Sequence, residues 1–176
     1  MPPVRIIAGA KKGHNIAAPR GIETRPTSDR VRENVFNILG PVQGGTVLDL
    51  YAGSGAMGLE ALSRGAAQAV FVDDDREAVR AVERNLDKLG LRGTVLLQDA
   101  VAMLTSEKRK YDLVLVDPPY EMYADIEPQL ARYLPPVLAD GAVVVVETDA
   151  RVQPALPFRE RTSRKYGSAR ITVYDA

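Results

Sequence analysis

The residues Asp117-Pro118-Pro119-Tyr120 carry the most distinctive chemistry in this sequence. They follow the apolar run 112–116, and two consecutive prolines restrict the backbone directly beyond it. The Asp117 carboxylate and the Pro118 carbonyl can each accept an N–H bond from an exocyclic amine on a planar base, and Tyr120 can stack on that base. The segment predicts a site that points an amine toward an electrophile. A rigid loop without a function is the alternative interpretation.

A glycine-rich segment, residues 47–65, has the pattern of a nucleotide-cofactor site. The short apolar run 47–50 leads into Gly53, Gly55 and Gly58, and helix-forming residues follow. Glycine permits a sharp turn and a close approach of the backbone to a ligand, and the free amides at a helix start donate hydrogen bonds. This spacing does not identify the cofactor, and a purely structural turn remains an alternative.

Acidic residues stand at the ends of the first four expected strands: Asp49, Asp73, Asp99 and Asp117. Ligands of open parallel sheets bind across the carboxyl ends of the strands, so we expect these four to converge on one crevice. Asp73 lies 20 positions after Gly53, where a carboxylate would accept hydrogen bonds from ribose hydroxyls. Asp99 is expected to meet an adenine amine. Acidic residues also cap helices, and this role is expected for Asp75.

Short apolar runs alternate with helical patterns from residue 46 onward and predict a parallel sheet covered on both faces. The expected strands are 47–50, 69–72, 95–97, 112–116 and 142–146, with helices after the glycine loop, at 79–89 and at 126–134. Runs 156–161 and 170–174 are separated only by the turn 165–168, so they should pair antiparallel. No repeat or linker marks a second domain.

The first forty residues predict two smaller elements. Residues 4–7 and 16–18 flank a polar, glycine-containing stretch and favour a hairpin with a basic tip over a disordered tail. A helix should follow, capped by Ser28 or Asp29, with Val31, Val35, Ile38 and Leu39 on its buried face and with Arg30, Arg32 and Glu33 presented elsewhere.

Composition excludes several classes of protein. The 176 residues contain no cysteine and one histidine, so a disulfide scaffold, a thiolate nucleophile and a Cys/His zinc site are excluded, and no metal is expected. No apolar run approaches the ~20 residues of a membrane span, and the start lacks a secretory signal core, so we expect a soluble, cytoplasmic protein.

Charge is unevenly distributed although the formal net charge is zero. Residues 1–32 carry seven Lys or Arg and two acidic residues, and residues 151–170 carry six and one. Residues 33–150 carry ten basic and nineteen acidic residues. Clustered cations at both ends favour a polyanionic partner, and an ordinary solvated surface is the alternative.

A resemblance to a known family joins these motifs. The glycine loop DLYAGSGAMGLEALSRG, the acidic strand ends and DPPY resemble class I S-adenosylmethionine-dependent methyltransferases that act on amines. The segments RIIAGAKKGHNIAAP, TRPTSDRVRENVFNIL and KYGSARITVY resemble the RsmD-type family, which methylates N2 of a guanine in bacterial 16S ribosomal RNA. The similarity covers nearly the whole chain. Where this family commonly has Glu at the end of the second strand this chain has Asp73, so Asp74 competes as the ribose ligand.

The resemblance implies a Rossmann-like α/β fold with seven mostly parallel strands, an antiparallel last strand, helices on both faces and a small N-terminal hairpin. It implies one methyltransferase domain over 1–176, in which residues 1–23 form a basic extension and residues 24–176 form the core that binds S-adenosylmethionine. It further implies a 16S rRNA or small-subunit substrate, a flipped target base and a monomer.

The site residues that follow from the resemblance form three groups. The cofactor group is Asp49, Tyr51, Gly53, Ser54, Gly55, Asp73, Asp74, Asp99 and Ala100, and the group around the target amine is Asp117, Pro118, Pro119 and Tyr120. The RNA group is Arg5, Lys11, Lys12, Arg25, Thr27, Arg30, Arg164 and Lys165, of which Thr27 and Arg30 would line the cofactor or base pocket.

Three other functions remain open at this point. A DNA N6-adenine methylase shares DPPY. A nicotinamide-dependent oxidoreductase shares the glycine loop and Asp73 but gives no reason for DPPY. A non-catalytic RNA-binding module would use the basic ends alone.

Overall fold

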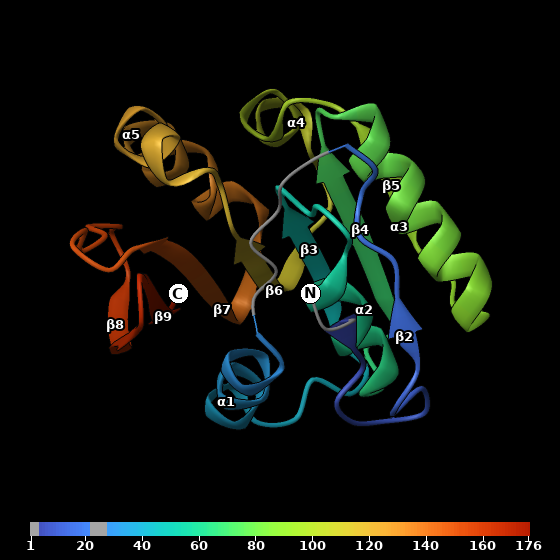
Figure 1. The fold of residues 1–176 in the computed structure, drawn as a ribbon. Helices are drawn as coiled ribbons and strands as arrows, with labels where there is room; N and C mark the ends of the chain where they lie inside the picture. The colour runs from blue at the N-terminus through green and yellow to red at the C-terminus, as the bar shows by residue number, and fades with distance from the viewer. Residues whose placement is uncertain (1–3, 22–27) are drawn as a thin grey trace.

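A seven-stranded sheet forms the centre of the computed structural model, which describes residues 4–21 and 28–176 (Figure 1). Its order is β5-β4-β3-β6-β7-β9-β8, in which β9 is antiparallel to both neighbours and the pairs among β3 to β7 are parallel. This confirms the predicted mostly parallel sheet with an antiparallel last strand. The strands are β3 (Thr46–Leu50), β4 (Gln68–Asp73), β5 (Thr94–Leu97), β6 (Tyr111–Val116), β7 (Leu138–Asp149), β8 (Arg159–Tyr166) and β9 (Ala169–Asp175).

Helices cover both faces of the sheet because alternate strand residues point to opposite sides. Val114 and Val116 of β6 pack in one apolar cluster, with α4 and α5, whereas Leu113 and Leu115 pack in the other, with α1, α2 and α3. None of the helices among the described residues is both long and apolar enough to cross a bilayer. The helices are α1 (Asp29–Leu39), α2 (Ala56–Ser63), α3 (Arg76–Leu89), α4 (Ala100–Ser106) and α5 (Tyr123–Tyr133), with 3₁₀ turns η1 (Tyr120–Met122) and η2 (Pro135–Val137).

Two elements differ from the sequence-based expectation. Helix α4 was not predicted, because its seven residues are too few for a periodic pattern. Strand β8 lies later than the expected run 156–161, because Leu156 is buried in the core before the strand begins. The strand itself is a polar edge strand, RERTSRKY, without an apolar signal.

The predicted N-terminal hairpin is present. Strands β1 (Val4–Arg5) and β2 (Asn15–Ile16) pair antiparallel, with Val4 opposite Ile16. Its turn packs on the C-terminal end of α2, where Ser63 Oγ accepts a hydrogen bond from Lys11 N at 2.9 Å and donates one to Ala8 O at 2.7 Å. The hairpin is therefore fixed to the core.

A buried ion pair joins the hairpin, α1 and α2. The Glu60 side chain is 0% exposed and accepts hydrogen bonds from Ile7 N at 2.8 Å and Ala8 N at 3.1 Å. Arg32 is also 0% exposed, and its guanidinium donates to Glu60 Oε1 at 3.3 Å and to the Arg5 carbonyl. The expectation that α1 presents Arg32 away from the domain is therefore wrong: a carboxylate on α2 draws this guanidinium inward. Ser28 is the cap of α1, with its Oγ accepting from Val31 N at 3.2 Å.

We expect Glu60→Ala to lower the free energy of unfolding by about 3–5 kcal/mol, because it leaves two backbone N–H groups without their acceptor and removes one of the two carboxylates that pair with the buried Arg32, the other being Asp29 at 2.9 Å. Urea unfolding followed by circular dichroism measures the loss. The matched control is Arg80→Ala, which removes the exposed Arg80–Glu77 pair and should change stability by less than about 0.5 kcal/mol. Equal small losses in both variants would contradict a structural role for the Glu60 carboxylate.

Candidate active site

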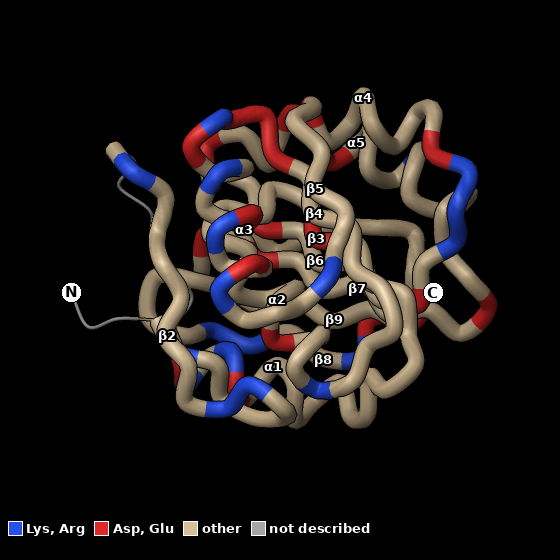
Figure 2. The backbone as a smooth tube through the Cα atoms, turned by 90° about the vertical axis from the view of Figure 1, so that its right-hand side faces the viewer, with Lys and Arg blue, Asp and Glu red and all other residues tan. Residues whose placement is uncertain are grey.

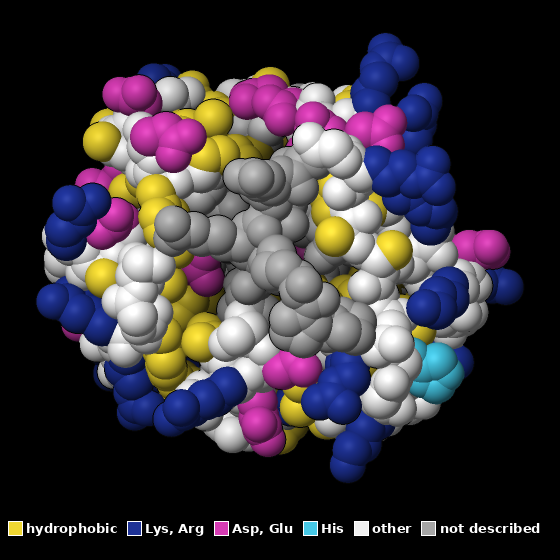
Figure 3. Space-filling model, viewed as in Figure 1, with side chains coloured by type: hydrophobic (Ala, Val, Ile, Leu, Met, Phe, Trp, Pro, Cys, Tyr) yellow, Lys and Arg dark blue, Asp and Glu magenta, His cyan; other side chains and the backbone are white. Residues whose placement is uncertain are grey.

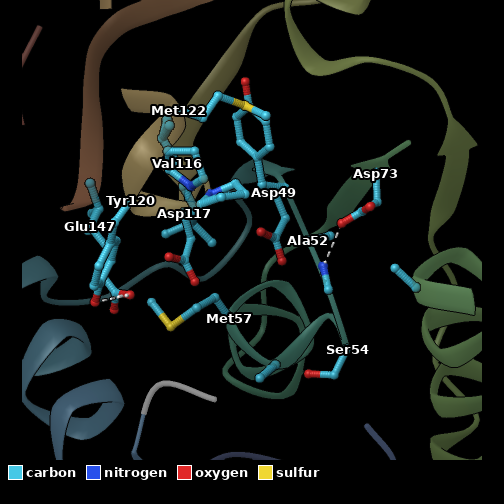
Figure 4. Close-up of a pocket in the computed structure, with 18 of the residues that line it drawn as sticks. Asp49, Ala52, Ser54, Met57, Asp73, Val116, Asp117, Tyr120, Met122 and Glu147 are labelled. Carbon is cyan, nitrogen blue, oxygen red and sulfur yellow. Dashed lines mark hydrogen bonds between the residues drawn. The ribbon is translucent and has the colours of Figure 1, made fainter. Parts of the chain in front are cut away.

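A cavity of about 720 Å³ lies where the strands β3, β4, β6 and β7 end. This is within the size range of small-molecule sites. The glycine loop forms one side of its wall, and the Asp117–Tyr120 segment forms another (Figure 4). Of the four acidic strand ends expected to converge, Asp49, Asp73 and Asp117 line the cavity. The rule about strand ends therefore correctly predicted that three of the four residues lie at one cavity.

Three residues of the predicted cofactor group are not among the residues that line the cavity: Gly55, Asp99 and Ala100. Asp99 instead caps α4, with its Oδ2 accepting a hydrogen bond from Ala102 N at 2.9 Å. It still lies close enough to Tyr51 for its charge to help raise the pKa of that phenol. A contact of Asp99 with an adenine ring stays a prediction.

The glycine loop has left-handed backbone at three alternate positions. Gly53 and Gly55 have φ of 58° and 83°, and Tyr51 adopts φ of 59°, which is uncommon for a residue with a side chain. A Cβ on Gly53 would meet open space, so its backbone faces the cavity without cover. A Cβ on Gly58 would lie 2.4 Å from the Phe71 ring, so this glycine allows α2 to pack against β4.

Asp49 connects the loop to the sheet. Its carboxylate is 3% exposed and accepts a hydrogen bond from Gly58 N at 3.0 Å. Burial raises the pKa of Asp49 to about 8, the Gly58 bond opposes this rise, and the nearby Asp73 charge adds to it. This rise favours the protonated form of Asp49 at neutral pH.

Asp73 fixes the turn between β4 and α3. Its Oδ2 accepts from Gly53 N at 3.0 Å and its Oδ1 accepts from Asp75 N at 3.0 Å. Burial raises the pKa of Asp73, with these bonds opposing. Asp75 caps α3 as predicted, with its Oδ1 accepting from Glu77 N at 2.8 Å. Asp74 is exposed and also lines the cavity, so both Asp73 and Asp74 remain candidates for a ribose.

Tyr51 carries a buried hydroxyl that hydrogen-bonds to none of the described residues. Burial raises the pKa of Tyr51 to about 12, and the charges of Asp99, Asp74 and Asp73 add to the rise. The Tyr51 hydroxyl is thus a buried hydrogen-bond donor near three carboxylates, in a residue with left-handed backbone. A polar ligand could supply the acceptor for such a donor.

The Asp117–Tyr120 segment leaves β6 with Pro118 buried and Tyr120 in η1. Burial raises the pKa of Asp117 well above its usual range. The charge of Glu147 and a hydrogen bond to Glu147 add to this rise, and the charge of Asp49 adds less. Tyr120 Oη donates to Glu147 Oε2 at 3.3 Å (Figure 4). The acceptor and the ring thus lie together on the cavity wall.

The sequence reading missed two polar residues near the cavity. Glu147 follows the apolar run 143–146 within β7 and is 9% exposed, so the strand-end rule applied to a fifth strand would have found it. Asn85 is 1% exposed and donates to Ser54 O and Ala17 O, both at 2.9 Å. Asn85 lies among apolar positions on the buried face of α3, and a polar residue at such a position could have been recognised in the sequence.

The cavity is strongly acidic. None of the described residues that line it is Lys, Arg or His. A wall of this kind favours ligands that carry positive charge or hydrogen-bond donors and disfavours phosphate groups. The acidic residues in the wall are Asp49, Asp73, Asp74, Asp75, Asp117, Glu121, Glu147 and Asp149.

Basic residues lie on the outer surface. Arg5 pairs with Asp29 at 3.5 Å, and Arg25 and Thr27 lie outside the described residues. Figure 2 shows Lys and Arg positions along α3, around α1 and in the hairpin, and Figure 3 shows them on both sides of the face seen in Figure 1. The following predicted RNA contacts form no ion pair with any described residue: Lys11, Lys12, Arg30, Arg164 and Lys165.

Comparisons with known proteins agree with this geometry. The "Putative rRNA methyltransferase YlbH" of Bacillus subtilis is 39% identical over 185 residues, covering 97% of this chain and 98% of that protein. The "Ribosomal RNA small subunit methyltransferase D" of Escherichia coli is 38% identical over 156 residues, covering 88% and 78%. The solved structure "Putative methyltransferase yhhF" from Escherichia coli superposes with a TM-score of 0.85 at 32% identity, covering 99% and 98%.

A family profile matches almost the whole chain. The profile described as Conserved hypothetical protein 95 matches residues 4–175. The match takes in the hairpin, the glycine loop, the DPPY segment and the tail that carried the resemblance. The chain therefore belongs to this family, the RsmD-type methyltransferases.

Proposed function

We propose that this protein transfers a methyl group from S-adenosylmethionine to the exocyclic N2 amine of a guanine in bacterial 16S ribosomal RNA. One observation carries the proposal: the Asp117–Tyr120 segment, whose carboxylate, carbonyl and ring could hold an amine, lines the same cavity as the glycine loop. The names of its relatives support an rRNA substrate. We further propose that the whole chain works as one cytoplasmic, monomeric methyltransferase unit.

The residues of the cavity fit a cationic nucleoside cofactor. A sulfonium and an amino group are attracted by the acidic wall, whereas the pyrophosphate of a dinucleotide would be repelled by it. This difference argues against a nicotinamide-dependent oxidoreductase. Gly53 and Gly55 would receive the methionine part, Asp73 or Asp74 the ribose, and Asp99 with Ala100 the adenine. The bound cofactor would supply an electrophilic methyl group whose donor leaves as a neutral thioether.

The residues around the target amine act by orientation. The Asp117 carboxylate and the Pro118 carbonyl would each accept one N–H bond from the amine, which directs its lone pair into the cavity. Tyr120 would stack on the base. Because the nitrogen loses its extra proton only after it has gained the methyl group, Asp117 is not required as a strong general base. A paired base could not reach these groups, so the guanine must be flipped out of its helix.

The function is tested by labelled methyl transfer to small ribosomal subunits from a strain that lacks this gene, followed by mapping of the modified nucleoside. Methyl label on N2 of a single guanine supports the proposal. Label on adenine of duplex DNA would instead support the DNA N6-adenine methylase. Tight RNA binding without any transfer would support the non-catalytic RNA-binding module.

We expect Asp117→Ala to lower methyl transfer by at least about 10²-fold, because it removes an acceptor that positions the amine. Its cofactor affinity, measured by calorimetry, should stay within about threefold of that of the unchanged protein. The exposed Asp125 of α5 provides the control, since Asp125→Ala removes the same charge outside the cavity. A large loss of cofactor binding in Asp117→Ala would contradict the orienting role.

Cofactor binding should release a proton from Asp49. Below pH 8 this carboxyl is mostly protonated, and a cation in the cavity favours its ionised form, so affinity should rise with pH by up to about tenfold per unit. Calorimetry in buffers of different ionisation enthalpy counts the released protons. Asp49→Asn keeps an acceptor for Gly58 N but cannot titrate, so it should release fewer. Protons released by the cofactor itself are the same for the unchanged protein and for Asp49→Asn. Equal proton release by the two proteins would therefore contradict a titrating role for Asp49.

Replacement of Lys11 and Lys12 by Ala should weaken RNA binding and reduce the slope of log affinity against log salt by about 1–2, because two phosphate contacts are lost. Filter binding of small-subunit RNA between low and high salt measures both quantities. The control removes Lys108 and Lys110, which are exposed and lie just before β6 starts, at the edge of the sheet opposite the cavity. An unchanged slope in the Lys11/Lys12 variant would exclude the hairpin as an RNA contact.

A further inference from the structure

Glu147 occupies a position that the proposed mechanism does not yet use. Val116 of β6 pairs with Val146 of the adjacent parallel strand β7. Asp117 and Glu147 are the next residues along these two segments and therefore lie side by side. Both side chains line the cavity, and Figure 4 shows the Tyr120 ring beside Glu147. The hydrogen bond from Tyr120 Oη to Glu147 Oε2 fixes the direction of this carboxylate.

Two neighbouring carboxyl groups in a buried wall are costly. Each loses hydration, and their charges repel when both are ionised. The repulsion is seen in Asp117, whose pKa is raised by burial and then by Glu147. An apolar residue at position 147 would avoid this cost. A ligand that brings several hydrogen-bond donors to both carboxyl groups would offset it.

The edge of guanine presents such donors. Its N1–H lies next to the N2 amine, so a carboxylate pair can accept from both atoms at once. Adenine presents an unprotonated N1 beside its amine, and this lone pair would face the second carboxylate. A site that buries an acceptor strongly rejects an analogue that lacks the matching donor, because the acceptor is left unpaired.

We propose that Glu147 determines the specificity for the target base by accepting the N1–H of guanine while Asp117 holds its N2 amine, with the Tyr120 hydroxyl fixing the Glu147 carboxylate. The proposal rests on the function proposed above and adds how the base is chosen. It gives a reason for a buried acid beside Asp117 and distinguishes this DPPY pocket from one that accepts adenine.

The target nucleotide is first mapped with the unchanged protein. The test then compares guanine with 2-aminopurine at this position. 2-Aminopurine keeps the 2-amine but has no N1–H. Small subunits are reconstituted with RNA that carries either base, and initial rates of methyl transfer are compared. The unchanged protein should prefer guanine by at least about 10²-fold.

Two variants separate charge from hydrogen bonding. Glu147→Met keeps the length of the side chain but removes both carboxylate oxygens, and it should lower the guanine to 2-aminopurine ratio at least tenfold, mainly through the rate on guanine. Glu147→Gln keeps one acceptor and should give an intermediate ratio. Calorimetric cofactor affinity within about threefold of the unchanged protein shows that the variants are folded.

Three outcomes overturn the inference in distinguishable ways. If both substrates lose rate equally and the ratio is unchanged, Glu147 only supports Asp117 or Tyr120. If the unchanged protein methylates 2-aminopurine as fast as guanine, no group reads N1–H. If the unchanged protein methylates no guanine in the subunits, the proposed function fails first, and the base-reading role of Glu147 fails with it.

Discussion

Carboxyl groups crowd one edge of the sheet, and the cost of removing them from water is the constraint on which the rest of the site depends. Burial raises the pKa of Asp49 to about 8, with the Gly58 hydrogen bond opposing and the Asp73 charge adding to the rise, and burial together with Glu147 raises the pKa of Asp117 well above its usual range. Backbone N–H groups offset part of this cost at Asp49 and at Asp73. The turn of the glycine loop brings the amides of Gly53 and Gly58 to these two carboxylates. The loop therefore stabilises the acidic ends of the strands in addition to any contact with a ligand.

The N-terminal segment is coupled to this edge through two buried polar residues. Glu60 ties the hairpin to the far end of α2, and Asn85 ties Ala17 to the glycine loop at Ser54. Beyond Ala17 the chain reaches Pro19, which lines the cavity. A surface that we propose to contact RNA is thus connected to the loop that we propose to hold the cofactor by hydrogen bonds rather than by a flexible linker.

Sequence patterns predicted the parts of the fold that depend on local signals. The apolar strands β3, β4, β6 and β7, the caps at Ser28 and Asp75, and the convergence of Asp49, Asp73 and Asp117 were predictable because each depends on residues close in sequence or on one topological rule. The N-terminal hairpin was predicted from the apolar runs 4–7 and 16–18 on either side of a polar, glycine-containing stretch.

The features that escaped depend on contacts between distant segments. Nothing near Arg32 in the sequence reveals that a carboxylate on α2 will bury it, and the polar edge strand β8 carries no alternation of apolar residues. Asp99 fitted the strand-end rule but lies outside the cavity wall, and it caps α4, a helix too short to be recognised from the sequence. Glu147 was missed although the rule applied to it.

Under the proposed function, the division of charge would explain how a protein with zero net charge binds a polyanion. Exposed cations lie outside the cavity, where phosphates can be neutralised, and carboxyl groups line the inside, where phosphates are excluded. A flipped nucleotide would therefore enter with its donor-bearing base edge first and leave its phosphates at the basic surface. The same wall holds a cation more tightly than a neutral molecule of similar shape. Under the proposed function, methyl transfer removes the sulfonium charge and weakens this attraction, so the acidic wall that favours binding of the cofactor also favours release of its product.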